Sequence, residues 1–258
     1  MLRKLLKYEV KATAMVFVCM YLAIIGLSIF NKLFNTFNFQ RGKVLTGCIV
    51  VALFVALGVT TVIMAVQRFN KNLLGDEGYL MFTLPVDSKK IIISKLLVTL
   101  MWTVISGLVA IISFIILFSA YIDWYSIKEV ISQIQVLWHS FNEEITEQIH
   151  MNAGVFISCI AIGGAASYIE FILIIYGSLT VAQLPVFSKH RGLSAFGTFF
   201  VLNILVNNVL TAIFARCINL SETSAQAIIL SGITVVIIIC IGLFFGINTI
   251  LSKHLNLE

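Results

Sequence analysis

The sequence predicts an all-α integral membrane protein with six transmembrane helices, and three observations carry this prediction. Only 11% of the 258 residues are charged, whereas an ordinary soluble domain has about 25%. The mean hydropathy is +1.04. Six mostly apolar stretches reach the length of about 18 residues that a helix needs to cross a bilayer. A single large water-soluble domain is therefore excluded, because too few charged side chains are present to cover its surface.

The six stretches are predicted to be helices because a helix satisfies its own backbone hydrogen bonds within hydrocarbon. The predicted spans are 13–31, 44–66, 96–122, 153–184, 193–215 and 225–251. The connections between them are too short for a second folded domain of ordinary size. We therefore expect residues 1–258 to form a single transmembrane domain.

The positions of the basic residues predict the orientation of the spans. Of the 17 Lys and Arg residues, 12 flank the spans on the side of the two termini. The other five are Lys32, Arg41, Lys43, Lys128 and Arg216. Basic flanks are retained in the cytoplasm, so both termini are predicted to be cytoplasmic. The net charge of +5 is accordingly interpreted as a topology signal, and no nucleic-acid partner is expected.

The segment 1–12 is predicted to be a helix that lies in the headgroup layer of the membrane. Taken as a helix, it separates an apolar face from a basic face. The apolar face has Leu2, Leu5, Leu6 and Val10, and the basic face has Arg3, Lys4, Lys7 and Lys11. Membrane lipid is therefore an expected partner. The alternative is a basic flank that only orients the first span.

The connection at 67–95 is the longest one predicted on the cytoplasmic side. Asp76 and Glu77 can cap a short apolar and aromatic helix, which Pro85 would end. A helix of this kind needs a surface to cover it. The candidates are the membrane interface and a cytoplasmic partner protein.

The connection at 123–152 is predicted to be an amphipathic helix on the outer side of the membrane, packed on the bilayer surface or on the ends of the spans. In a helix its apolar residues share an arc of about 120°. These residues are Ile127, Val130, Ile131, Ile134, Leu137, Trp138, Phe141, Ile145 and Ile149. The opposite face carries His139, Glu143, Glu147 and His150.

That polar face is predicted to be solvated and to hold no metal ion. Its four potential ligands extend over about 16 Å of helix at 1.5 Å per residue, too far apart to close on one ion. Glu143 and Glu147 mark an acidic outer face, which would attract cationic molecules.

Three polar residues within the spans are candidates for a transport path or for contacts between helices. Glu170 is an acid deep in the fourth span, where a charge costs at least about 2.5 kcal/mol. Its alternative role is that of a side chain near a helix break that reaches the membrane interface. Asn203 and Asn207 repeat at helical spacing in the fifth span, and amides at such positions commonly join neighbouring helices.

Two segments resemble a known family. GDEGYLMFTLPVDSKKIIISKLL at 75–97 and IYGSLTVAQLPVFSKHRGL at 175–193, with the basic start and six spans, resemble permease subunits of type-2 ATP-binding-cassette (ABC) exporters, especially small ones of Gram-positive bacteria. The resemblance implies that 75–84 is a coupling helix that docks in a cleft of an ATPase subunit. The implied contact residues are Asp76, Glu77, Tyr79, Leu80 and Phe82.

The chain also departs from that family. Many such permeases have a long outer hairpin between spans 5 and 6, but here residues 217–224 are too few for it, and the long outer segment lies at 123–152 instead. The substrate-exit arrangement of the family is therefore not carried over. The sequence has no GxxxxGK[ST] phosphate-binding loop. The chain is thus expected to be no enzyme and to bind no cofactor, with ATP hydrolysis on a partner chain.

The leading functional hypothesis is a permease subunit of the bacterial plasma membrane. It would form a homodimer or a heterodimer with a similar permease, and a cytoplasmic ABC ATPase would drive it. An amphipathic or peptide-like substrate is expected, such as an antimicrobial peptide exported for resistance. Two alternatives stay open, an ATP-independent secondary transporter and a membrane scaffold that recruits a cytoplasmic partner.

Overall fold

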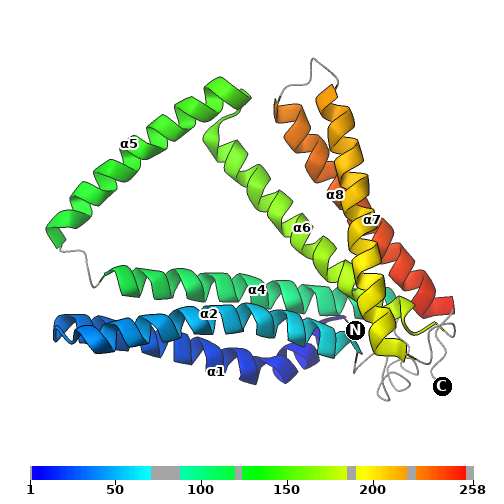
Figure 1. The fold of residues 1–258 in the computed structure, drawn as a ribbon, viewed down its shortest axis with the longest axis horizontal. Coiled ribbons are helices and arrows are strands. Elements are labelled where there is room, and N and C mark those ends of the chain that lie inside the picture. The colour runs from blue at the N-terminus through cyan, green and yellow to red at the C-terminus, as the bar shows by residue number, and fades with distance from the viewer. Residues whose placement is uncertain (1, 71–87, 120–123, 185–189, 220–224, 254–258) are drawn as a thin grey trace. The chain divides into compact units, whose positions relative to one another are not determined.

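A computed structural model describes residues 2–70, 88–119, 124–184, 190–219 and 225–253, which are helical and contain no strand. The helices are α1 (Leu2–Thr36), α2 (Gln40–Phe69), α4 (Ser88–Phe118), α5 (Trp124–Ile149), α6 (Ala153–Val181), α7 (Arg191–Asn219) and α8 (Ala225–Lys253) (Figure 1). Apart from α5, each contains a segment long and apolar enough to cross a membrane, which makes six candidate spans. The predicted all-helical membrane architecture is confirmed at this level.

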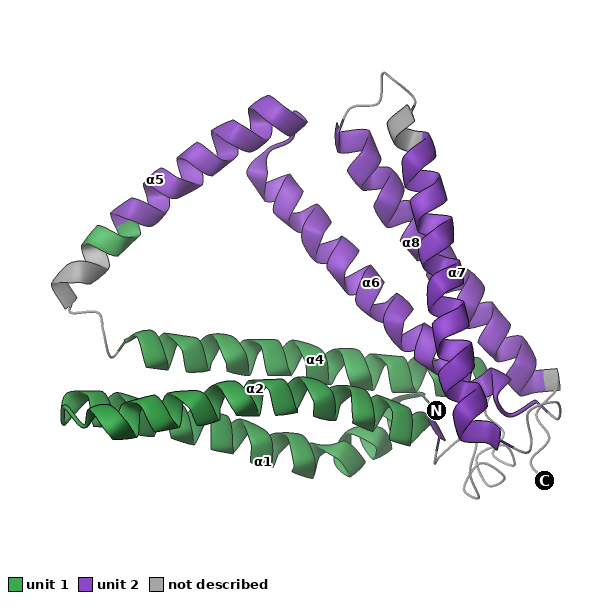
Figure 2. Ribbon diagram, in the orientation of Figure 1, with its two compact units in different colours: residues 1–69, 85–131 green, residues 70–84, 132–258 purple. Residues whose placement is uncertain are grey.

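The chain divides into two compact units, and the expected single transmembrane domain stays a prediction. Unit 1 comprises residues 1–69 and 85–131, and unit 2 comprises residues 70–84 and 132–258 (Figure 2).

Unit 1 is built from α1, α2 and α4, which run side by side (Figure 1). Phe17, Tyr21 and Ile24 of α1 form its core with Leu57 of α2 and with Val98, Trp102 and Val109 of α4. The rings of Phe17 and Trp102 are stacked, with centroids 4.6 Å apart and planes 9° from parallel. Aromatic pairs of this kind stabilise a core beyond the area that they bury.

The turn between α1 and α2 depends on two residues. Asn38 has a φ of 53°, in the left-handed region that asparagine tolerates better than most side chains. Gly42 lies against the ring of Phe39, so closely that a Cβ atom at this position would overlap the ring. The absence of a side chain at Gly42 therefore allows the Phe39 ring to pack onto the start of α2.

The first turns of unit 1 differ from the separate interfacial helix predicted at 1–12. Helix α1 continues from Leu2 to Thr36 without a break. Leu6 and Val10, from the predicted apolar face, pack against the core of unit 1. At least part of that face therefore contacts protein.

Unit 2 is built around α6, which packs against α7 and α8. Gly163 of α6 faces Ile233 of α8, and the hydroxyl of Thr198 in α7 donates a hydrogen bond of 3.2 Å to the carbonyl of Ser178 in α6. The rings of Phe171 and Phe199 meet edge to face. Small residues, apolar side chains and aromatic rings thus contribute to this packing.

The predicted amphipathic segment forms α5, so its helical character is confirmed. Its apolar stripe is uncovered over several turns, with Ile131, Ile134 and Leu137 exposed by 51%, 58% and 67%. In the C-terminal part of α5, the Asn142 side chain accepts a hydrogen bond of 2.9 Å from the backbone N–H of Ala153. Asn152 caps the start of α6, so both asparagines hold the turn that joins the two helices.

Candidate functional site

The most distinctive polar feature of unit 1 is a buried ion pair. Lys95 Nζ of α4 lies 2.8 Å from Glu9 Oε1 of α1, and the two side chains are only 1% and 3% exposed. The same ammonium donates a second hydrogen bond, of 2.9 Å, to the backbone carbonyl of Arg68 in α2. One side chain therefore joins all three helices of unit 1. Leaving either charge of such a pair alone in a buried site costs about 3–5 kcal/mol.

The bond to the Arg68 carbonyl satisfies an acceptor at the end of α2. The last carbonyls of a helix have no donor within the helix, and a cation at this end also interacts favourably with the helix dipole. α2 ends at Phe69, whose side chain is fully buried, and Ile91 and Ile92 at the start of α4 are buried as well. The two helix ends that flank residues 70–87 are thus anchored together.

A row of further hydrogen bonds continues from the ion pair along the α1–α4 contact. Thr13 Oγ1 donates to the Glu9 carbonyl at 2.9 Å and accepts from Trp102 Nε1 at 2.8 Å. Farther along, the hydroxyls of Tyr21 and Ser106 are 2.9 Å apart. We call Glu9, Lys95, Thr13, Trp102, Tyr21 and Ser106, with the Arg68 carbonyl, the polar seam.

Sequence reasoning missed this seam. It counted Lys95 only as a flanking charge and assigned Glu9 no role. A signal was present, because Glu9 lies on the same helical face as Leu5, Leu6 and Thr13. An acid on the apolar face of an otherwise basic segment requires a partner when it is buried.

The predicted polar residues of the spans fall in unit 2. Glu170 is buried in α6, with 8% of its surface exposed. Helix α6 runs from Ala153 to Val181 through Gly163 and Gly164, so no helix break lies beside Glu170. One turn before Glu170, the Ala166 carbonyl lies 3.6 Å from Cys240 Sγ of α8. Glu170 therefore lies in a stretch of α6 that packs against α8.

The two asparagines of α7 bond to each other along their own helix. Asn207 Nδ2 donates to the Asn203 carbonyl at 2.8 Å and to Asn203 Oδ1 at 2.7 Å. Asn207 is exposed and Asn203 is half-buried. The bonds that the structure places on this amide pair therefore run within α7, and the expected contact with another helix stays a prediction.

The remaining predicted site residues are either outside the described residues or on an exposed face. The proposed ATPase contacts Asp76, Glu77, Tyr79, Leu80 and Phe82 lie outside the described residues. Glu143 and Glu147 are exposed on α5. Among the residues that the structure describes, no group of three His, Cys, Asp or Glu side chains could hold a metal ion.

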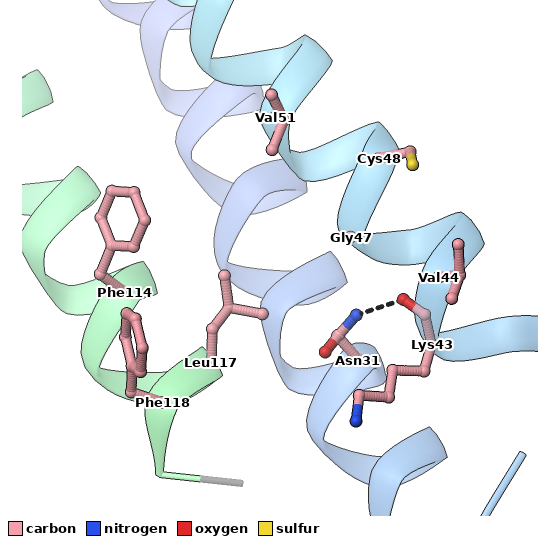
Figure 3. A pocket seen from close by; sticks show the side chains of 9 residues that line it. All are labelled: Asn31, Lys43, Val44, Gly47, Cys48, Val51, Phe114, Leu117 and Phe118. Atoms are coloured by element: carbon pink, nitrogen blue, oxygen red, sulfur yellow. Dashed lines mark hydrogen bonds between the residues drawn. The ribbon is translucent and has the colours of Figure 1, made fainter. Parts of the chain in front are cut away.

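Each unit also has an apolar cavity. The one in unit 1, of about 590 Å³, lies between α2 and α4 beside the Asn31 and Lys43 side chains (Figure 3). The one in unit 2, of about 710 Å³, is lined by apolar and small residues of α6, α7 and α8 and by Ile149 of α5. Of the residues that line these two cavities, Lys43 is the one with a charge.

Comparisons of the chain with protein-family models, with curated proteins and with solved structures found no match.

Proposed function

We propose that this chain is the transmembrane permease subunit of an ATP-driven ABC transporter in the bacterial plasma membrane. Both termini and the segment 67–95 lie in the cytoplasm in this proposal, and the polar face of α5 lies outside. A separate ATPase docks on the segment 75–84. Six candidate spans support a permease, and two such chains, identical or similar, form the transport pathway between them.

The observation that carries the proposal is the position of Lys95. It ties the end of α2 to α4 through the Arg68 carbonyl and ties both to α1 through Glu9. These are the helices on either side of the segment that the ATPase is proposed to grip. A displacement of that segment would move all three helices of unit 1 as one body, because buried charges cannot be separated without a large loss of stability.

This arrangement supports alternating access. ATP binding and hydrolysis would shift the ATPase, the segment 75–84 would follow, and unit 1 would transmit the movement across the membrane. Asp76, Glu77, Tyr79, Leu80 and Phe82 are the proposed ATPase contacts. An amphipathic, peptide-like substrate is proposed, and Glu143 and Glu147 on the outer face suit a cationic one.

Co-purification tests the central partner. The chain is expressed with candidate ABC ATPases from neighbouring genes, and we expect one of them to remain bound after solubilisation. Tyr79→Ala with Phe82→Ala should release it, whereas Tyr8→Ala, a change of an exposed tyrosine of α1, should not. If the ATPase stays bound to the variant Tyr79→Ala with Phe82→Ala, the proposed docking segment is contradicted.

Reconstitution distinguishes the alternatives. Vesicles that contain the complex should move a fluorescently labelled cationic amphipathic peptide only when ATP is supplied. Movement by the lone chain, driven by an ion gradient, would instead identify a secondary transporter. Glu170→Gln tests the transport path, since a path residue should lose transport at normal expression and a packing residue should not.

A further inference from the structure

The cavity of unit 1 has two chemically different parts. Its walls are apolar, with Val44, Gly47, Cys48 and Val51 of α2 opposite Phe114, Leu117 and Phe118 of α4 (Figure 3). Asn31 and Lys43 are its polar members (Figure 3). Its volume of about 590 Å³ is in the range of about 300–1,000 Å³ that small-molecule sites occupy. The geometry suits a ligand with an apolar body and a polar end.

The polar end of the cavity is held in place by hydrogen bonds. Asn31 is 4% exposed, and its Nδ2 donates to the Lys43 carbonyl at 2.7 Å and to Thr46 Oγ1 at 2.8 Å. Lys43 Nζ donates to Asn35 Oδ1 at 2.9 Å. This amide oxygen orients the ammonium at the cavity, and an ammonium can donate to several acceptors at once.

The local charge favours an anion. Residues 29–48 contain three cations, Lys32, Arg41 and Lys43, and no acid. A cationic peptide would be repelled here, and a fully apolar ligand would make no use of the ammonium. A phosphate diester next to an acyl chain matches both parts of the cavity.

Part of the cavity wall is exposed. Val51, Phe114 and Phe118 are exposed by 63%, 49% and 59%, and α2 and α4 are both candidate spans. Lipid can therefore enter sideways from the bilayer. The ring of Phe114 is stacked on that of Phe54 with centroids 5.4 Å apart, which keeps one wall rigid for an acyl chain.

We propose that the cavity of unit 1 is a binding site for an anionic phospholipid, with one acyl chain between α2 and α4 and the phosphate on Lys43. The site lies at the end of α1 and α2 that is opposite to the buried Glu9–Lys95 pair along α1. A bound lipid would therefore stabilise the turn between α1 and α2. The proposal does not depend on the proposed transport function, because its test uses neither an ATPase nor a transported substrate.

Cysteine protection tests the site directly. Cys48 lines the cavity of unit 1, whereas Cys19 of α1 does not, and both cysteines are exposed. The purified chain is delipidated in a neutral detergent and mixed with phosphatidylglycerol or with phosphatidylcholine of the same chains. N-ethylmaleimide labelling is then followed by mass spectrometry. Phosphatidylglycerol should slow the labelling of Cys48 but leave that of Cys19 unchanged.

Variants of Lys43 give the expected magnitude. Lys43→Gln should weaken the phosphatidylglycerol protection about fivefold, as expected for the loss of one cation at an anionic headgroup, and Lys43→Arg should retain most of it. Val51→Trp should reduce binding by filling the cavity, as measured by native mass spectrometry. Far-ultraviolet circular dichroism shows whether each variant is folded. If Lys43→Gln is not folded, Lys43→Arg keeps the test decisive.

Several outcomes would overturn the proposal. These are equal protection by phosphatidylcholine and phosphatidylglycerol, undiminished protection in Lys43→Gln, and protection by a cationic amphipathic peptide. Protection by soluble glycerol phosphate alone would assign the site to a free phosphate compound and reject the lipid.

Discussion

Unit 1 and unit 2 each pack three candidate spans, but they do so by different chemistry. In unit 1 the helices are joined by directional bonds between polar side chains, above all Lys95 with Glu9 and Trp102 with Thr13. In unit 2 the contacts between helices are mostly apolar, and some of them involve small residues, with Gly163 against Ile233 and Gly177 against Leu202. Within a bilayer both solutions hold helices together.

The difference has a mechanical consequence. Hydrogen bonds to buried charges lose their energy when the atoms move apart, so the helices of unit 1 should keep their register. Apolar contacts between packed helices allow small sliding movements. Unit 1 is therefore suited to transmit a displacement as a rigid body, and unit 2 is suited to adjust its packing.

The largest effect on stability is expected from the removal of Lys95, which holds unit 1 together. Lys95→Met leaves Glu9 as an unpaired buried charge and should destabilise the chain by about 3–5 kcal/mol. Denaturant unfolding in mixed micelles, followed by circular dichroism, measures the effect. Lys90→Met, at an exposed position of the same helix, is the matched control and should leave the midpoint unchanged.

The double variant Glu9→Gln with Lys95→Met separates the charge from the packing. The double variant leaves no unpaired buried charge, but the amide introduced at position 9 and the Arg68 carbonyl lose their partner, so part of the lost stability should return. If Lys95→Met alone unfolds at the midpoint of Lys90→Met, the ion pair does not hold unit 1 together.

The next largest effect is expected from Trp102→Phe. This change keeps an aromatic ring for the stack on Phe17 but removes the Nε1–H that donates to Thr13. A lost buried hydrogen bond and the smaller ring should lower the free energy of unfolding by about 2 kcal/mol. A cycle with Thr13→Val isolates the bond, and strictly additive effects would show that the two side chains are not coupled.

A glycine substitution in unit 2 should have the smallest effect of the series. A Cβ atom at Gly232 would lie 2.5 Å from the ring of Phe214. The ring is partly exposed and can shift, so Gly232→Ala should destabilise by only about 1 kcal/mol.

Gly242 is the matched control for that change. A Cβ atom at Gly242 or at Gly246 would have no neighbouring atom within 4 Å, and Ala favours a helix over Gly, so Gly242→Ala should not destabilise the chain. A larger loss for Gly242→Ala than for Gly232→Ala would contradict the packing described for unit 2.

The sequence predicts the positions of the long apolar helices well, because a long apolar run is a local signal. The start of α1 shows a contact that the sequence does not predict. Its basic residues are visible in the sequence, but the pairing of Glu9 with Lys95 joins residues separated by 86 positions, and local periodicity carries no information on such a contact. Likewise, the helical spacing of Asn203 and Asn207 places them on one face without showing that their amides bond to each other.

The α5 stripe illustrates a second limit. Periodicity predicts its apolar face and the structure has the helix, yet Leu137 and Trp138 are exposed. A sequence pattern identifies a face that requires a cover, but it does not identify what covers it.

The most direct test of the central claim is ATP-driven transport by the double variant Glu9→Gln with Lys95→Met. The variant is reconstituted in vesicles with the proposed ATPase partner, and export of the labelled cationic amphipathic peptide is measured per ATP hydrolysed. If the ion pair transmits the movement of the ATPase, the complex should assemble and hydrolyse ATP while transport per ATP falls severalfold. Transport per ATP equal to that of the unmodified chain would contradict the proposed role of the Glu9–Lys95 pair.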